Sequence, residues 1–314
     1  MKLLLRLALA GALVGLLTLM LGSWTRINGA GLTCPDWPLC HGQLLPSMAE
    51  GTIWEWSHRL LAFAVAPLVI ALIAVAWPQR RQSPFIAPAT GVIAFLFVVQ
   101  IFLGAQTVRL ANAPLSVVLH WATAMALIAS LAAMAIFGAA ADTAARRATA
   151  TSRPSTPLGM TPAVAVALAM TTIAAFVTMC IGAYVSSSGA GLACLSIPGC
   201  AGNVVVYTAG QYVQMLHRIA AAGTLVCASG ALALSWAHGT TNRVRAAAVA
   251  GVALVGVQVL LGLLNVALRL PADLREAHAA VAALVFLAFF VATALAVLDG
   301  VTAAETKLTE SARR

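Results

Sequence analysis

Eight uninterrupted apolar stretches constrain this chain more than any other feature. They cover about 4–24, 53–77, 86–106, 114–140, 162–184, 212–237, 246–268 and 276–298. A helix of roughly 20 apolar residues crosses a hydrocarbon core about 30 Å thick. Only 9% of the residues are charged and 61% are hydrophobic, a balance that excludes a soluble or nucleic-acid-binding domain. Because the apolar runs are continuous and not alternating, they argue against a β-barrel. The sequence predicts an all-α integral membrane protein with eight transmembrane helices.

The basic residues indicate the orientation of these helices. If the N-terminus is cytoplasmic, twelve of the 18 Lys and Arg residues fall on cytoplasmic segments and six on outer segments or outer helix ends. Since cytoplasmic loops are enriched in Lys and Arg, we expect both termini in the cytoplasm of a cell (inner) membrane protein. The alternative is a cleaved signal peptide ending near Ala8-Leu9-Ala10, but the apolar run continues well past that point.

The second half of the chain repeats the first. Residues 17–40 align without a gap with 177–200, including a Gly-Ala-Gly-Leu motif and two cysteines. Later matches follow in the same order: His58-Arg59 with His217-Arg218, and Gln100, Gly104 and His120 with Gln258, Gly262 and His278. Each half holds four spans, so the halves share one orientation, as in a parallel repeat. We expect two tandem four-helix bundles over 1–140 and 162–314, joined by a cytoplasmic linker over 141–161.

Four histidines occupy equivalent positions in the even-numbered spans: His58, His120, His217 and His278. Under the predicted topology each lies one to two turns below the outer surface. Ionisable side chains within a membrane are costly and mark functional sites, although interhelical hydrogen bonding is the alternative. Two facing imidazoles in each four-helix half suit axial ligation of a haem iron. A zinc site, which needs three or four ligands, fits two histidines less well.

Several arginines lie near the predicted outer face. Arg59 and Arg218 directly follow two of the histidines, and Arg109, Arg269 and Arg275 fall on the same side. They are candidate partners for haem propionates, or alternatively interfacial anchors. His41 and His238 have no partner in the repeat and are interpreted as a loop residue and an interfacial residue.

Two cysteine pairs with the same spacing fall in the long outer loops, about 25–52 and 185–211. Cys34 and Cys40, like Cys194 and Cys200, are six positions apart with a proline between them. Disulfides persist outside the cytoplasm, so each pair can close a small loop. The spacing leaves open whether such a pair is a structural staple or is redox-active. Cys180 and Cys227 lie within spans and are interpreted as small buried residues.

One difference between the halves suggests chemistry. Glu55 lies three residues before His58, whereas the equivalent position before His217 holds Gln214. A carboxylate can accept or donate a proton, and an amide cannot. We therefore expect the N-terminal half to carry out the reaction and the C-terminal half to hold a permanent haem that passes electrons. The alternative is that Glu55 only hydrogen-bonds a neighbour.

The chain resembles the haem A synthase family in the strings GAGLTCPDWPLCHG (29–42), WEWSHR (54–59), GAYVSSSGAGLAC (182–194), QMLHR (214–218) and REAH (275–278). The resemblance implies oxidation of the C8 methyl of haem O to a formyl group, giving haem A for aa3-type terminal oxidases. By this resemblance His58 and His120 flank haem O, His217 and His278 ligate a haem B cofactor, and Glu55 is catalytic. It also implies the disulfides Cys34–Cys40 and Cys194–Cys200. Haem O synthase and an electron acceptor are the implied partners.

The chain departs from the family in its second outer loop. Relatives often have an arginine where this chain has Ser186 and a proline where it has Leu195. These changes put a charge-based role of that loop in doubt without touching the histidines. Three other functional classes remain open: a bis-histidine b-type electron-transfer cytochrome, a transporter built from parallel repeats, and a membrane thiol oxidase. The presence of Glu55 in one half only argues against an electron-transfer cytochrome. The position of the histidines near the outer face argues against a transporter. The third needs a quinone site and an exchange path between the cysteine pairs, and the sequence shows neither.

Overall fold

A computed structural model describes residues 1–49, 51–149, 162–200, 202 and 206–311. Within these residues the long helices are α1 (Lys2–Ile27), α2 (Thr52–Gln79), α3 (Ile86–Arg109), α4 (Pro114–Thr149), α5 (Pro162–Ser187), α6 (Ala209–Ala237), α7 (Asn242–Ala267) and α8 (Ala272–Ser311). A short 3-10 helix, η1, covers Ala190–Leu192. The eight long helices are each long and apolar enough to cross a membrane. The predicted all-α membrane fold is confirmed.

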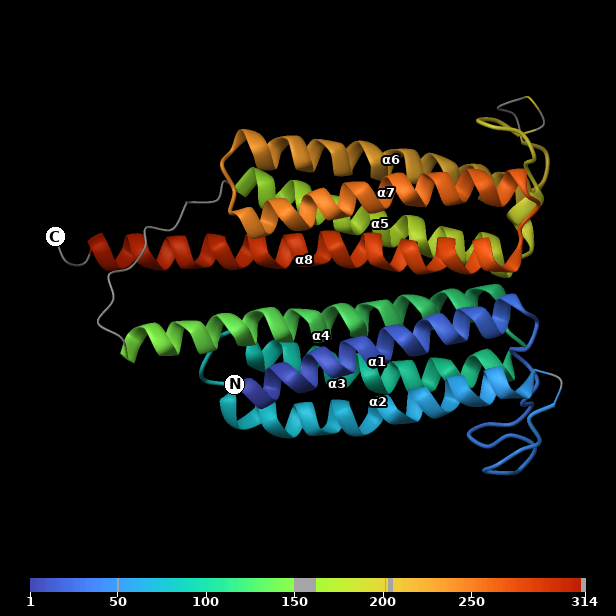
Figure 1. The fold of residues 1–314 in the computed structure, drawn as a ribbon, viewed down its shortest axis with the longest axis horizontal. Helices are drawn as coiled ribbons and strands as arrows, with labels where there is room; N and C mark the ends of the chain where they lie inside the picture. The colour runs from blue at the N-terminus through green and yellow to red at the C-terminus, as the bar shows by residue number, and fades with distance from the viewer. Residues whose placement is uncertain (50, 150–161, 201, 203–205, 312–314) are drawn as a thin grey trace.

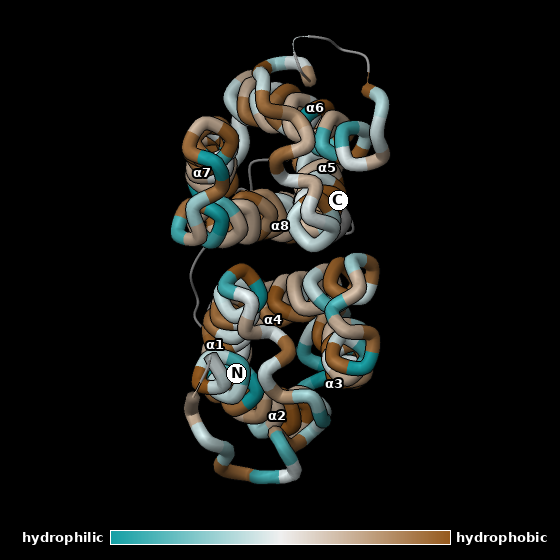
Figure 2. The backbone as a smooth tube through the Cα atoms, turned by 90° about the vertical axis from the view of Figure 1, so that its right-hand side faces the viewer, coloured by the Kyte–Doolittle hydropathy of each residue, from teal (hydrophilic) through white to brown (hydrophobic). Residues whose placement is uncertain are grey.

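The helices form two bundles that lie side by side. Figure 1 shows α1–α4 in one bundle and α5–α8 in the other, and the end-on view of Figure 2 places α4 against α8 between them. The α1–α2 and α5–α6 loops emerge at the same end, where the α3–α4 and α7–α8 turns also lie. We call this the loop end. Which side of the membrane it faces stays a prediction.

The expected boundary at residue 140 falls inside a helix. Helix α4 continues to Thr149, so the first part of the segment predicted as a linker is helical. The rest of that segment, 150–161, lies outside the described residues.

Apolar packing joins the two bundles and fills each of them. The largest cluster combines α1 and α4 residues such as Leu19 and Met125 with α8 residues such as Phe289. Phe289 lies over Gly251 of α7, where an added Cβ would be 2.8 Å from the ring. Small residues allow this close approach of membrane helices. Near the loop end Arg26 of α1 donates to Ser186 Oγ of α5 at 3.0 Å, so the halves are also linked by a polar contact.

The Gly-Ala-Gly-Leu motifs turn the chain out of α1 and α5 in the same way. Gly29 and Gly189 have φ angles of +74° and +73°, a conformation that favours glycine. Two residues later, Gly31 and Gly191 make room for the neighbouring α3–α4 and α7–α8 turns. Asn112 Nδ2 donates to Gly31 O at 2.9 Å, and the Leu270 side chain lies against Gly191. The motifs therefore join each long loop to the short turn beside it.

Candidate functional site

Each of the four membrane histidines packs its ring over a glycine of the preceding helix. A Cβ added to Gly22 would lie 2.6 Å from His58 Cε1, and one added to Gly182 would lie 2.8 Å from His217 Cε1. The corresponding distance is 3.2 Å both for Gly104 with His120 and for Gly262 with His278. Any larger residue at these glycines would displace the rings, so the four positions form glycine cradles for imidazole.

The histidines of α2 and α6 are oriented by backbone carbonyls. His58 Nδ1 lies 2.9 Å from Thr18 O, and His217 Nδ1 lies 3.2 Å from Thr178 O. A carbonyl only accepts, so Nδ1 must carry the hydrogen in both rings. Nε2 is then left with its lone pair, the form in which an imidazole ligates a metal.

The histidines of α4 and α8 contact glutamine side chains instead. Gln100 Nε2 lies 3.2 Å from His120 Nδ1, and Gln258 Nε2 lies 3.1 Å from His278 Nε2. Among the described residues, both Oε1 atoms are buried with no hydrogen-bond partner, and the Gln258 backbone is a further hydrogen-bond partner for the His278 ring.

The histidines come together in pairs, one pair in each bundle. The ring centroids of His217 and His278 are 6.3 Å apart, with the ring planes at 76°. His58 and His120 are close enough to interact electrostatically. Across the described residues no group of three or more His, Cys, Asp or Glu side chains could hold a metal ion together. Two imidazoles over glycine cradles, with partnerless buried polar atoms beside them, fit axial ligation of a haem iron in each bundle better than a zinc site.

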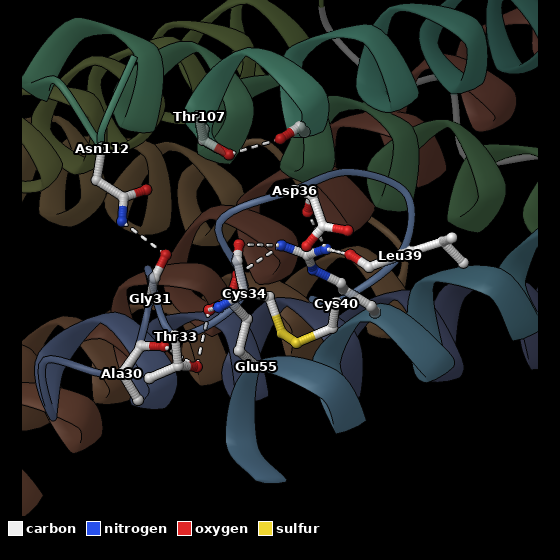
Figure 3. A network of polar contacts seen from close by, with 12 residues as sticks. Ala30, Gly31, Thr33, Cys34, Asp36, Leu39, Cys40, Glu55, Thr107 and Asn112 are labelled. Atoms are coloured by element: carbon white, nitrogen blue, oxygen red, sulfur yellow. Dashed lines mark hydrogen bonds and ion pairs between the residues drawn. A yellow bond between two sulfur atoms is a disulfide. The ribbon is translucent and has the colours of Figure 1, made fainter. Parts of the chain in front are cut away.

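Glu55 lies at the start of α2, buried beneath the α1–α2 loop (Figure 3). Its Oε1 accepts from Arg59 Nη2 at 2.7 Å, one helical turn along α2. Its Oε2 accepts from the Thr33 hydroxyl at 3.0 Å and from the Cys34 N–H at 2.9 Å. The carboxylate therefore bonds the loop and Arg59, and it is near enough to His58 for electrostatic interaction.

Gln214 occupies the same place beneath the second loop. Its Oε1 accepts from the Cys194 N–H at 2.6 Å, and its Nε2 donates to Gly191 O at 2.8 Å. The residue type thus differs between the halves while the bond to the first cysteine of the loop is kept. Compared with Gln214, Glu55 adds a negative charge, which forms an ion pair with Arg59.

The two arginines that follow the histidines hold the outer loops. Arg59 donates to the carbonyls of Cys34, Asp36 and Leu39 as well as to Glu55. Arg218 donates to four carbonyls, those of Cys194, Ser196, Pro198 and Gly199, at 2.7–3.1 Å. Both guanidinium groups therefore bind loop backbone. Of the other candidate propionate partners, Arg109 is exposed at the end of α3 and Arg275 is half-buried in the first turn of α8.

Both cysteine pairs form disulfides, Cys34–Cys40 and Cys194–Cys200, and all four cysteines are buried. Cys180 and Cys227 are free and half-buried. In the first loop the Asp36 carboxylate accepts from the backbone N–H groups of His41 at 2.6 Å and Gly42 at 2.8 Å. These bonds, that from Gly42 above all, hold the pKa of Asp36 below its usual value.

The cradling glycines and the carbonyls of Thr18 and Thr178 were not identified as site residues from the sequence. For Gln100 and Gln258 the sequence indicates only that their positions match in the repeat. The signal was present in the repeat, because Thr18, Gly22, Gln100 and Gly104 all recur in the second half. Thr33, by contrast, has no such signal, since the matching position holds Ala193.

Comparison with known proteins shows the family to which the chain belongs. The model of the COX15-CtaA family, described as cytochrome oxidase assembly protein, matches residues 5–290. A protein of Bacillus pumilus named heme A synthase is 32% identical over 215 residues, which cover 66% of this chain and 67% of the relative. Proteins of the same name from Shouchella clausii and Shewanella oneidensis are 32% and 27% identical, covering 69% and 87% of this chain and 70% and 90% of the relatives. The chain belongs to the COX15-CtaA family of cytochrome oxidase assembly proteins.

Proposed function

We propose that this chain is a haem A synthase of the cell (inner) membrane, an oxidoreductase that converts the C8 methyl of haem O to the formyl group of haem A. The family and the shared name of the relatives support an enzyme of haem A synthesis. The observation that carries the assignment within the chain is the pair of histidines in each bundle, with the buried carboxylate of Glu55 in the first half at the position that Gln214 occupies in the second.

The two bundles take different roles in this proposal. His58 and His120 flank the iron of haem O, the substrate, in the 1–140 half. His217 and His278 hold a haem B cofactor in the 162–314 half. Haem B, when bound, supplies a one-electron carrier. An electron acceptor outside the chain and haem O synthase are the expected partners.

The reaction proceeds by two hydroxylations. In each, the methyl carbon gains oxygen from water and loses two electrons and two protons, giving first a hydroxymethyl group and then a geminal diol. The diol loses water to form the aldehyde. Glu55 accepts a proton in this scheme. Its ion pair with Arg59, one turn further along α2, fixes the carboxylate on the helix that carries His58. The Cys34 N–H and the Thr33 hydroxyl fix the other carboxylate oxygen.

Glu55→Gln tests the role of the carboxylate with little change in structure. Gln214 already accepts from a cysteine N–H at the equivalent position, so an amide at residue 55 keeps the loop bond. We expect normal haem content but no formyl haem in pigment extracted from cells supplied with haem O. Gln214→Glu is the matched control and should leave haem A formation intact. Haem A made at the wild-type rate by Glu55→Gln would remove the catalytic role.

Replacing the second histidine pair tests the cofactor assignment. His217→Ala and His278→Ala should each abolish the low-spin haem B spectrum of the purified protein, because each would remove one of the two imidazoles that would hold the haem iron. Persistence of that spectrum in both variants would show that the pair holds no haem. The double substitution His58→Ala with His120→Ala serves as the control, and it should leave the haem B spectrum in place.

A further inference from the structure

One arginine of the first bundle reaches into the second. Arg26, in the last turn of α1, donates from Nη2 to Ser186 Oγ on α5 at 3.0 Å. The two positions are equivalent in the repeat, because residues 17–40 align with 177–200. They therefore meet across the junction of the bundles, where one half carries a guanidinium group and the other a hydroxyl.

This contact lies on the loop-end side of the second histidine pair. On α5, Ser186 follows Gly182, the cradle of His217, by four residues. On α8, Arg275 precedes His278 by three residues. Residues three or four apart share one face of a helix. Ser186 and Arg275 therefore each lie about one turn closer to the loop end than the groups that place the two imidazoles.

The charges at this place do not balance. Arg26 is close enough to both Arg275 and Glu276 for electrostatic interaction, and one carboxylate cannot neutralise two guanidinium groups. Within the part of the chain that the structure describes, the Arg26 side chain makes one hydrogen bond, to a neutral hydroxyl, and the Arg275 side chain makes none. Each guanidinium carries five donors in a geometry that suits a carboxylate. The arrangement favours a further carboxylate at this position.

The other arginines at the loop end of the second bundle are less suited to a ligand. Arg218 directly follows His217, but it donates to four carbonyls of the outer loop. Arg269 is exposed in the α7–α8 turn. Arg275 and, from the first bundle, Arg26 are half-buried and remain as cations for an anionic group beside the histidine pair.

We propose that Arg26 and Arg275 bind a propionate of the haem held by His217 and His278, so that the first bundle completes the cofactor site of the second. A haem carries its two carboxylates at the porphyrin edge, and a paired guanidinium is the strongest partner that a side chain offers them. The inference rests on the assignment of the second histidine pair as haem ligands within the proposed function. It does not rest on the oxidation of haem O.

The test compares haem B with its dimethyl ester, in which both propionates are blocked and uncharged. Each is titrated, by absorbance, into full-length protein purified without haem and carrying His58→Ala and His120→Ala, so that only the second pair can bind. This parent protein should bind haem B more tightly than the diester. Adding Arg26→Gln should weaken haem B binding by about tenfold and leave diester binding unchanged. Arg81→Gln, exposed in the α2–α3 turn, is the control and should change neither affinity.

Exchange of the two equivalent residues provides a second, matched variant. Arg26→Ser combined with Ser186→Arg returns a guanidinium group to the same contact from α5, so the preference for haem B over the diester should be kept. Loss of that preference would overturn the inference, and this variant decides if Arg26→Gln does not fold.

Two results with Arg26→Gln would also overturn the inference. Unchanged haem B affinity would show that the guanidinium serves another partner, such as lipid headgroups. Equal weakening of haem B and diester binding would show that Arg26 only holds the bundles together. Failure of the proposed function is distinguishable, because the parent protein would then bind neither ligand at the second histidine pair.

Discussion

Single glycines set how closely each histidine ring approaches the neighbouring helix. Without a Cβ at Gly22 or Gly182, the ring carbon Cε1 of the histidine reaches the helix surface and Nδ1 reaches a carbonyl one turn earlier. The glycine and the carbonyl therefore act together, one admitting the ring and the other fixing its tautomer. The same pairing in both bundles explains why Gly22 recurs as Gly182, whereas the carbonyls of Thr18 and Thr178 are main-chain groups that any residue would supply.

Gly182→Ala should displace the His217 ring and weaken haem binding in the second bundle by about 10–100-fold. The added Cβ would lie 2.8 Å from His217 Cε1, a distance that requires the ring to move. Absorbance of the bound haem during titration measures the effect. Gly223→Ala is the matched control, because a Cβ there meets no atom within 4 Å. Alanine improves helix stability by about 1 kcal/mol in both variants, so equal haem binding in the two would contradict the cradle.

Asp36 should make the first outer loop sensitive to acid. Its pKa is lowered in the folded protein from the ordinary 3.8, mainly by the Gly42 N–H. A carboxylate with a lowered pKa contributes stability that is present above its unfolded pKa and is lost as the pH falls through the folded value. The protection of the His41 and Gly42 amides, measured as the ratio of the intrinsic to the observed hydrogen-exchange rate, should therefore fall below about pH 4. Asp36→Ala should show fast exchange at every pH. Protection in that variant equal to wild type would exclude the carboxylate as the cause.

At the scale of elements, the N-terminal segments of α2 and α6 bind the outer loops. Each supplies an acceptor for a cysteine N–H, Glu55 or Gln214, and one turn later an arginine that gathers loop carbonyls. The disulfide closes the same segment covalently. The loops are thus fixed to the helices that carry His58 and His217, so a shift in either loop would be transmitted to the histidine helix.

Arg218→Lys should loosen the second loop although the charge is kept. The guanidinium bonds four carbonyls at once, and a lysine ammonium has only three donors on a single nitrogen. Loss of one such bond, about 1 kcal/mol, should speed reduction of Cys194–Cys200 by about fivefold. Maleimide labelling after timed exposure to dithiothreitol measures this rate. Arg80→Lys, at the opposite end of the first bundle, is the control. Equal reduction rates in the two variants would contradict the inference that Arg218 holds the second loop.

At the scale of the whole molecule, apolar runs alone were sufficient to predict the eight helices, because a membrane span needs a fixed length of apolar sequence. The repeat also pointed to His58, His120, His217 and His278. The partners of Arg59 and Arg218 could not be predicted in this way. They depend on the path of the loop backbone, which brings carbonyls of residues such as Leu39 and Gly199 over the helix end and leaves no pattern in side-chain type. The extension of α4 to Thr149 was missed because residues 141–149 are too polar to resemble a span.

The placement of both histidine pairs toward one end of the bundles makes the orientation of the whole molecule a test of its function. We expect the loop end, with Leu44 exposed upon it, to face the extracytoplasmic side, and the α2–α3 turn that contains Gln82 to face the cytoplasm. In a background with Cys180 and Cys227 changed to alanine, a membrane-impermeant maleimide should label Leu44→Cys on intact cells. It should label Gln82→Cys only after permeabilisation. The reverse pattern would place the disulfide loops in the reducing cytoplasm, where they would not persist, and would invert the predicted topology.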